Sequence, residues 1–426
     1  MSFNKFTGEL PQVSDAVQSL DLAHNSFSGH LSSLLCHTGT DESILEYLDL
    51  SNNYLAQELP DCWKNWTLLS YIYLGNNQLV GQVPSTMGSS LYDLRALDLH
   101  NNGFSGEIPW TFHDCENLVL LNLEGNNFSG SIHTWIPQSV SIVKLRSNQF
   151  TGNIPPKLCA LSNLIVLDLA NNKLSGSIPH CLHNITSFFS VFDVGNLTFS
   201  RAYPSYEIPP INKFMKIGLH TKGQQLEYEK ILKLVRSIDL SANKLSGEIP
   251  EELFKLTKLQ SLNLSYNYLI GEIPEQIGEM NDLESLDLSH NYLHGNIPQS
   301  ISSLSFLSDL NLSYNHFSGQ IPLGTQLQSL DAWSYTDNPE LCGPPLQKNC
   351  TIPKKADNPE HGKGNEDYVF LKSLYLGMGV GFAVGFWLVC GSLFLNRAWR
   401  HAYFQFFNGV VERIYVIVNI KLQRSR

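Results

Sequence analysis

Apolar and polar positions follow one pattern that recurs about every 24 residues along most of this chain. The pattern is Leu-x-Leu-x-x-Asn-x-Leu/Phe-x-Gly-x-Ile-Pro. It reads LDLSNNYLAQELP from Leu48, LDLHNNGFSGEIP from Leu97 and LNLSYNYLIGEIP from Leu262. In Leu-x-Leu the two leucines point to one face of a short strand and their neighbours to the other face. Each unit therefore predicts one short strand followed by a turn.

Self-similarity at this period predicts an α/β repeat solenoid, namely a leucine-rich-repeat superhelix with a parallel β-sheet on its concave side. The asparagine of the pattern turns inward and bonds backbone groups that would otherwise be buried without partners. It occurs at Asn4, Asn25, Asn53, Asn77, Asn102, Asn126, Asn148, Asn172, Asn243, Asn267, Asn291 and Asn315. We expect these residues to be structural.

The period is broken once, between Asn172 and Asn243. The intervening stretch contains FSRAYPSYEIPPINKF and GLHTKGQQLEYEK, which are too rich in aromatic residues and proline for a simple flexible linker. A long insertion in a solenoid is usually a loop on one face, often the binding face, and the alternative is a solvated spacer. The predicted organisation is repeats over 1–183, with the first one truncated, an insertion over 184–230, repeats over 231–335 and a cysteine cap over 336–351.

The chain has a formal net charge of -11, but residues 396–426 carry six Lys or Arg against one Glu. An acidic body argues against nucleic-acid binding. Residues 373–395 carry no charge and would span roughly 34 Å as a helix, enough for a bilayer core. Arg397 and Arg400 follow directly, which predicts a cytoplasmic end. We therefore expect a juxtamembrane linker over 352–372, one transmembrane helix over 373–395 and a short cytoplasmic tail over 396–426.

The first residues, MSFNKFTGELP, already fit the repeat pattern and have neither the basic nor the apolar region of a signal peptide. We expect a chain that is truncated at its start.

Six of the eight cysteines are predicted to pair. Cys36 and Cys159 each lie 11 residues after a repeat asparagine, and Cys62 and Cys181 each lie 9 residues after the next one. Equal phase on neighbouring coils predicts the pairs Cys36–Cys62 and Cys159–Cys181 on the convex side, the alternative being free buried thiols. A third pair, Cys342–Cys350, would close the last repeat. Three disulfides indicate an oxidising compartment.

All seven Asn-x-Ser/Thr sequons precede the apolar segment, in agreement with an extracellular location of the repeats. They are Asn65, Asn127, Asn184, Asn196, Asn263, Asn311 and Asn349.

Residues that flank the strand leucines project from the concave face and differ along the chain. After the insertion they are mostly serines, whereas before it they are larger and include aromatic and charged residues, the types that dominate binding energy at interfaces. We expect ligand recognition in the insertion and at these upstream positions, the alternative for each being a merely solvated side chain. The upstream candidates are Tyr71, Tyr73, Arg95, His100, Glu124, Lys144 and Arg146.

The apolar segment contains a tandem GxxxG pattern at Gly377, Gly381 and Gly385, which would let a second helix approach closely. The chain shows no kinase motifs, no P-loop, no Gly-x-Ser-x-Gly and no HExxH. We therefore expect no enzyme, no metal and no cofactor.

The LSGxIP repeats, the cap NPELCGPPL, the GxxxG segment and the tail NRAWRHAYFQFFNGVVERIYVIV together resemble plant receptor-like proteins, specifically the group that perceives fungal ethylene-inducing xylanase. The resemblance implies a kinase-less plasma-membrane receptor of plant defence, single-pass type I, that perceives an extracellular protein or peptide. It also implies pairing with a short leucine-rich-repeat receptor kinase through Gly377, Gly381 and Gly385, and recruitment of a somatic-embryogenesis-type co-receptor kinase. Two alternatives are a non-signalling truncated decoy and an extracellular inhibitor of a microbial wall-degrading enzyme. The sequence does not name the ligand.

Overall fold

The computed structural model describes residues 1–36, 43–132, 135–188, 217–221, 224–228, 235–324, 327–328 and 330–350. All of them belong to the first of two units of the chain, residues 1–351, and the second unit is 352–426. The predicted linker, membrane helix and tail lie outside the described residues. Within the described part, the helices are too short or too polar to span a membrane.

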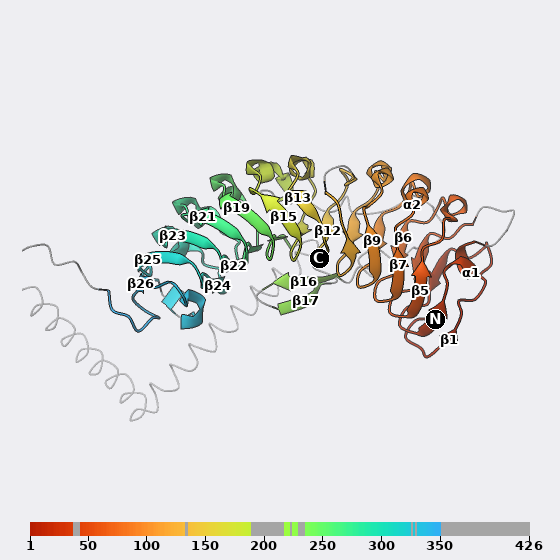
Figure 1. Cartoon of the computed structure of the whole chain (residues 1–426), viewed down its shortest axis with the longest axis horizontal. Coiled ribbons are helices and arrows are strands. Elements are labelled where there is room, and N and C mark those ends of the chain that lie inside the picture. Colours follow the sequence, from red (N-terminus) through yellow and green to blue (C-terminus); the bar gives the residue numbers. More distant parts are fainter. Residues whose placement is uncertain are drawn as a thin grey trace, which may run out of the picture. The chain divides into compact units, whose positions relative to one another are not determined.

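The first strand of each repeat joins an eleven-stranded parallel sheet that follows the inner side of the arc in Figure 1. Neighbouring repeats pair in register, so that Leu48 lies opposite Ile72 and Ile72 opposite Leu97. The parallel solenoid that the repeat pattern predicts is therefore confirmed. In order, the strands are β2 (Ser19–Asp21), β4 (Tyr47–Asp49), β6 (Tyr71–Tyr73), β8 (Ala96–Asp98), β10 (Leu120–Asn122), β12 (Ile142–Lys144), β14 (Val166–Asp168), β18 (Ser237–Asp239), β20 (Ser261–Asn263), β22 (Ser285–Asp287) and β24 (Asp309–Asn311).

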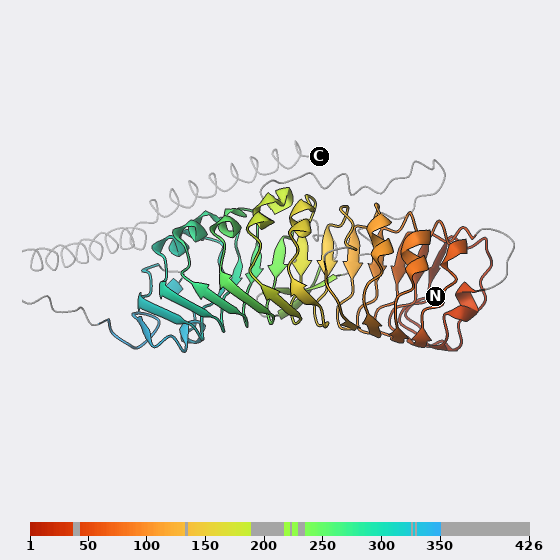
Figure 2. The ribbon, with the colours of Figure 1, turned by 45° about the horizontal axis from the view of Figure 1, so that its top comes forward.

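Two further parallel sheets, which the sequence analysis did not anticipate, run along the solenoid (Figure 2). They arise from the segment after the repeat asparagine, where the Leu or Phe points inward and the following Gly adopts a positive φ, such as +80° at Gly295. The first contains β1 (Thr7–Gly8), β3 (Ser26–Gly29), β5 (Tyr54–Glu58), β7 (Gln78–Gly81), β9 (Gly103–Gly106) and β11 (Asn127–Phe128). The second contains β13 (Thr151–Asn153), β15 (Lys173–Gly176), β19 (Lys244–Glu248), β21 (Tyr268–Gly271), β23 (Tyr292–Asn296), β25 (His316–Gln320) and β26 (Glu340–Cys342).

The outer side of the coils is formed by short helical segments, mostly of 3₁₀ type. Many of them begin directly after the proline of the pattern, because proline fixes an extended entry and lacks the N–H that a first helical turn leaves unpaired. The two α-helices of the described residues are α1 (Ser32–Leu35) and α2 (Ser85–Ser90). The 3₁₀ segments are η1 (Trp63–Asn65), η2 (Trp110–Asp114), η3 (Pro156–Ala160), η4 (His180–Asn184), η5 (Thr186–Phe188), η9 (Glu251–Lys255), η10 (Glu275–Glu279), η11 (Gln299–Ser303) and η12 (Ala332–Tyr335).

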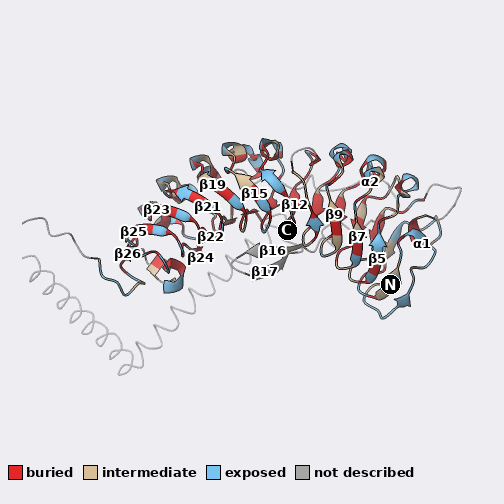
Figure 3. Ribbon diagram, viewed as in Figure 1, coloured by how far each residue is buried: buried red, intermediate tan, exposed pale blue. Residues whose placement is uncertain are grey.

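One apolar core runs through all coils from Leu10 to Leu341. In the further sheets buried and exposed residues alternate, as in β19 and β23, which is expected for elements with one inward face (Figure 3). In the concave sheet, by contrast, β8, β10, β12, β14 and β18 are buried at all three positions. The insertion does not interrupt this core. Phe188 is fully buried, β14 pairs directly with β18, and Leu174 N–H donates to Asn243 Oδ1 at 3.0 Å. The solenoid thus continues to Phe188, beyond the predicted boundary at 183.

Part of the insertion is described as an antiparallel hairpin. Its strands are β16 (Ile217–Thr221) and β17 (Gln224–Tyr228), with Ile217 opposite Tyr228. In Figure 1 the hairpin lies on the inner side of the arc.

The three predicted disulfides, Cys36–Cys62, Cys159–Cys181 and Cys342–Cys350, are all formed. Cys115 stays a free thiol, and burial raises its pKa to about 12. Beyond Asn315 the cap completes one more coil, in which Asn338 takes the role of the repeat asparagine. Its Oδ1 accepts from Phe317 N–H at 2.9 Å and its Nδ2 donates to Leu312 O at 2.9 Å.

Candidate functional site

The seven upstream candidates all lie on or beside the concave strands β6, β8, β10 and β12. Tyr71 and Tyr73 are on β6, Arg95 precedes β8 and His100 follows it, Glu124 follows β10, and Lys144 and Arg146 are at the end of β12. Because these strands are adjacent in the sheet, residues up to 75 positions apart form one surface. The structure therefore brings the candidates together, and their role in ligand binding stays a prediction.

An aromatic cluster forms the N-terminal part of this surface. The ring of Tyr47, on β4, lies 6.2 Å from that of Tyr71 and 5.7 Å from that of Tyr73, centroid to centroid. Tyr47 Oη donates to Asp49 Oδ2 at 3.2 Å. Burial raises the pKa of Tyr71 to about 12, although the positive charge of Arg95 opposes the shift. All three phenols are therefore neutral at physiological pH and act as apolar surfaces with polar ends.

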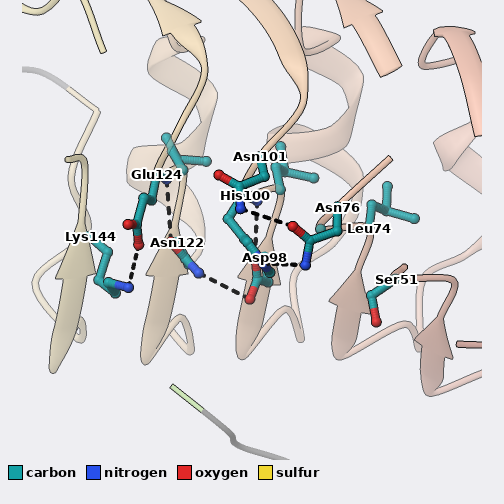
Figure 4. A network of polar contacts seen from close by, with 12 residues as sticks. Ser51, Leu74, Asn76, Asp98, His100, Asn101, Asn122, Glu124 and Lys144 are labelled. Atoms are coloured by element: carbon teal, nitrogen blue, oxygen red, sulfur yellow. Dashed lines mark hydrogen bonds and ion pairs between the residues drawn. The ribbon is translucent and has the colours of Figure 1, made fainter. Parts of the chain in front are cut away.

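A chain of polar contacts continues from the end of β8 (Figure 4). His100 Nδ1 lies 2.5 Å from Asp98 Oδ1, and His100 Nε2 lies 3.0 Å from Asn76 Nδ2. Asn122 Nδ2 donates to the other oxygen of Asp98 at 3.1 Å. Burial disfavours both charges, but their attraction outweighs it, so the pKa of His100 is raised and that of Asp98 is lowered. This pair is an ion pair at mildly acidic pH.

Glu124 and Lys144 form the next pair along the surface, with Lys144 Nζ bonded to Glu124 Oε2. The Lys144 side chain is only 2% exposed, and its ammonium also donates to the backbone oxygen of Gly218 on β16 at 2.6 Å. The ammonium group of Lys144 is thus bound by other parts of the chain and is not exposed to a ligand.

Arg146 contacts side chains of β14 and β18, the concave strands that flank the insertion in the sequence. Its Nε donates to Asp168 Oδ2 at 2.9 Å, and its terminal nitrogen bonds Asp239 Oδ2. Burial and the neighbouring Asp168 raise the pKa of Asp239 to about 6, against the opposing effect of Arg146. Arg146 therefore ties β12 to β14 and β18, and its contacts span the junction of the insertion.

The arrangement offers aromatic faces and paired charges on a wide surface, which suits recognition of a protein or peptide. Among the described residues, no three or more His, Cys, Asp or Glu side chains group in a way that would hold a metal ion.

The remaining predicted site residues divide by location. Asn65, Asn127, Asn184 and Asn349 are exposed, as attachment of a glycan requires. Asn263 and Asn311 are half-buried on β20 and β24, where their amides donate to Asp239 and Asp287 at 3.4 Å. Asn196 and the three glycines Gly377, Gly381 and Gly385 lie outside the described residues.

The sequence analysis missed two columns of rings on the repeats that follow the insertion. Tyr266, His290 and Tyr314 stack with centroids 3.9 and 4.1 Å apart, each at a positive φ, and Tyr268, Tyr292 and His316 form a parallel column at 6.2 Å. The repeated runs SYNYL, SHNYL and SYNHF indicated both columns, because equal phase places these residues side by side. These rings follow the concave strands, whereas the prediction of a plain serine surface considered only the residues that flank the strand leucines.

The family model for the Leucine Rich Repeat matches this chain nine times. The matches cover residues 16–38, 45–66, 93–115, 117–138, 163–185, 234–256, 258–280, 282–304 and 306–332.

Curated relatives include three receptor-like proteins. "Receptor-like protein EIX2" of Solanum lycopersicum is 43% identical over 100% of this chain and 42% of its own length. "Receptor-like protein EIX1" of the same species is 48% identical over 74% of this chain and 32% of its own length. "Receptor-like protein 32" of Arabidopsis thaliana is 36% identical over 90% and 44%. The chain thus spans less than half the length of these relatives.

Similar solved structures include receptor ectodomains. The plant peptide hormone receptor RGFR1 in complex with RGF2 is 31% identical with a TM-score of 0.62, covering 77% of this chain and 45% of that one. The Arabidopsis receptor kinase HAESA, in complex with the peptide hormone IDA and the co-receptor SERK1, is 28% identical with a TM-score of 0.54, covering 80% and 56%.

Proposed function

The chain belongs to the leucine-rich-repeat receptor-like proteins of plants, and from this premise we propose that it is a cell-surface receptor of plant immunity. It binds an extracellular protein or peptide of microbial origin and signals through partner receptor kinases. The repeats face the outside, residues 373–395 cross the plasma membrane once, and residues 396–426 lie in the cytoplasm.

The observation that carries this proposal is the change in residue type along the concave sheet. Strands β6 to β12 present tyrosines and charged side chains, whereas β18 to β22 begin with serines. Solenoids bind partners on such extended surfaces, and aromatic and arginine side chains supply most of the binding energy at interfaces. Tyr71 and Arg95 are half-buried at the surface and are therefore available to a ligand.

Two observations support the proposed ligand and kinase partners: a similar receptor structure and the GxxxG pattern of the sequence. HAESA is bound in its solved complex to a peptide hormone and to the co-receptor SERK1, which supports a peptide-like ligand and a co-receptor of that kind here. The tandem GxxxG at Gly377, Gly381 and Gly385 supports a short leucine-rich-repeat receptor kinase as the kinase partner, because small residues one turn apart allow close helix packing.

The membrane half of the proposal is tested by replacing Gly377, Gly381 and Gly385 with leucine in the tagged full chain expressed in plant tissue. Leucine side chains would keep the two helices apart, so we expect co-purification of the receptor kinase to be lost. The control replaces Leu376, Val380 and Val384, the residues that precede each glycine, with isoleucine or leucine. Undiminished kinase recovery with the glycine variant would contradict the proposed pairing.

A further inference from the structure

Burial along the concave face shows that part of this face is covered. The third residue of each strand points to that face, and the residue there is often aspartate. Asp98, Asp168 and Asp239 are buried, with exposed fractions of 6%, 3% and 3%, whereas Asp21, Asp49 and Asp287 in the same register are half-buried. Aspartates in one register are therefore buried from β8 to β18 and half-buried towards both ends of the sheet. The low exposure is confined to the middle of the sheet.

Lys144 occupies the same register on β12, at the centre of the covered part. A lysine side chain on an open sheet would extend its charged end into water, because removing an ammonium group from water without partners is strongly unfavourable. Lys144 is instead 2% exposed. A segment from outside the sheet that lies over Lys144 would account for this burial.

The structure identifies that segment. Lys144 Nζ donates to the backbone oxygen of Gly218, 74 residues away in sequence, at 2.6 Å. Gly218 is the second residue of β16, and its neighbours pair with β17. The bond to Glu124 balances the buried positive charge, which leaves the ammonium free to hold a neutral backbone oxygen.

We infer that Lys144 is a positioning residue that docks the insertion hairpin Ile217–Tyr228 onto the concave face over β8–β18. Lys144 is therefore engaged by the chain's own insertion and not by an external ligand, whereas Tyr71 and Arg95 stay half-buried at the surface. A two-stranded hairpin is marginally stable by itself, so its order depends on the surface against which it packs. An external ligand then meets the hairpin and the half-buried side chains beside it, such as Asp49 and Tyr71. The inference does not rest on the proposed function.

The first experiment measures the acylation rate of lysine side chains in the unmodified full chain, purified in detergent, with N-hydroxysuccinimidyl acetate as the probe. Lys173 is exposed on β15 and serves as the reference. We expect Lys144 to react at least about tenfold more slowly than Lys173, because a charge-assisted hydrogen bond corresponds to a factor of that order in an equilibrium. Replacing residues 217–228 with a glycine-serine segment of equal length should bring the rate of Lys144 close to that of Lys173.

Two outcomes of this experiment would overturn the inference. One is a Lys144 that reacts as fast as Lys173 in the unmodified chain. The other is protection of Lys144 that survives replacement of the hairpin, since Glu124 and the sheet would then account for it.

The second experiment measures amide hydrogen exchange of residues 217–221 and 224–228 in Lys144→Met and in the matched control Lys173→Met. Methionine keeps an unbranched apolar stem but has no donor for Gly218. We expect exchange in the hairpin to accelerate by about tenfold or more in Lys144→Met, with no change in Lys173→Met. Unaltered exchange in a Lys144→Met chain that keeps its unfolding midpoint would contradict the assigned role. If this variant fails to fold, the acylation rates in the unmodified chain and in the hairpin replacement decide the question.

Discussion

At the scale of single residues, a buried asparagine at the turn of most coils connects that coil to the one before it. Asn267 is 4% exposed. Its Nδ2 donates to the carbonyls of Leu240 and Leu264 at 3.0 and 3.1 Å, and its Oδ1 accepts from Leu245 N–H at 3.0 Å. Since Leu240 and Leu245 belong to the preceding coil, one amide side chain satisfies backbone groups of two coils.

Replacing Asn267 with alanine should lower the free energy of unfolding by about 2–4 kcal/mol, because several buried backbone groups lose their partner at once. Denaturant-induced unfolding followed by tryptophan fluorescence measures the change. Asn281→Ala, at an exposed position, is the control and should stay within about 0.5 kcal/mol of the unmodified chain. An equally small effect at Asn267 would show that its hydrogen bonds do not stabilise the coil.

The His100–Asp98 pair makes stability depend on pH in a defined direction. Asp98 has a lowered pKa in the fold, so its contribution is present above the unfolded pKa near 3.8 and is lost as pH falls through the folded value. His100 has a raised pKa, so its contribution is complete below the unfolded pKa near 6.5 and is lost as pH rises through the folded value. The pair therefore stabilises the fold most between these two limits.

His100→Gln should accordingly lower the thermal unfolding midpoint more at pH 5.5 than at pH 8.5, because the stabilisation from the raised pKa of His100 is complete below about 6.5 and declines as the pH rises. Differential scanning calorimetry at the two pH values gives the comparison. His30→Gln, at an exposed position, should show no such pH dependence. A larger loss at pH 8.5 than at pH 5.5 for His100→Gln would contradict the assigned ionisation.

At the scale of elements, the outer sides of neighbouring coils are joined covalently at two places. Cys36–Cys62 connects α1 to the segment before η1, and Cys159–Cys181 connects η3 to η4, directly before the insertion. The second bond holds the last coil before the aperiodic segment. Without it, that coil would depend on η5, the burial of Phe188 and the contacts to β18.

Replacing both Cys159 and Cys181 with alanine should lower the free energy of unfolding by about 3 kcal/mol, the value expected for a loop closed over 22 residues. The same replacement of Cys36 and Cys62, which close 26 residues, is the comparison and should have an effect of similar size. Chemical denaturation under non-reducing conditions measures both. Unchanged stability of the Cys159/Cys181 variant would mean that packing alone holds the coil before the insertion.

At the scale of the whole molecule, the distribution of glycosylation sequons and disulfides predicts the side of the membrane on which the repeats lie. Three disulfides are formed, and four of the sequons lie on exposed residues of the solenoid. Both features are typical of a protein that has passed through the secretory pathway.

Treatment with peptide-N-glycosidase should therefore increase the electrophoretic mobility of the chain expressed in plant cells. Replacing Asn65, Asn127, Asn184 and Asn349 with glutamine should remove most of that shift, because these four sequons are exposed in the fold. Absence of any shift in the unmodified chain would place the repeats outside the secretory lumen and contradict the receptor proposal.

The repeat pattern alone was sufficient to predict the sheet, the asparagine contacts and the disulfides Cys36–Cys62 and Cys159–Cys181, whereas Cys342–Cys350 was predicted from the cap that follows the last repeat. In a solenoid, equal phase in the sequence means proximity in space, so Cys159 meets Cys181 and Leu48 meets Ile72. The same rule also applies to Asn338, which takes the place of the repeat asparagine in the last coil, and to the stacked rings of Tyr266, His290 and Tyr314.

The tertiary structure alone decided which side chains of the concave face the insertion covers. Lys144 and Gly218 are 74 residues apart, and Arg146 and Asp239 are 93 residues apart. The insertion has no period, so no phase relation connects its residues to a coil, and only the folded chain shows which side chains it covers. For this reason the sequence placed Lys144 correctly on the concave face, while its burial beneath the hairpin became evident only from the structure.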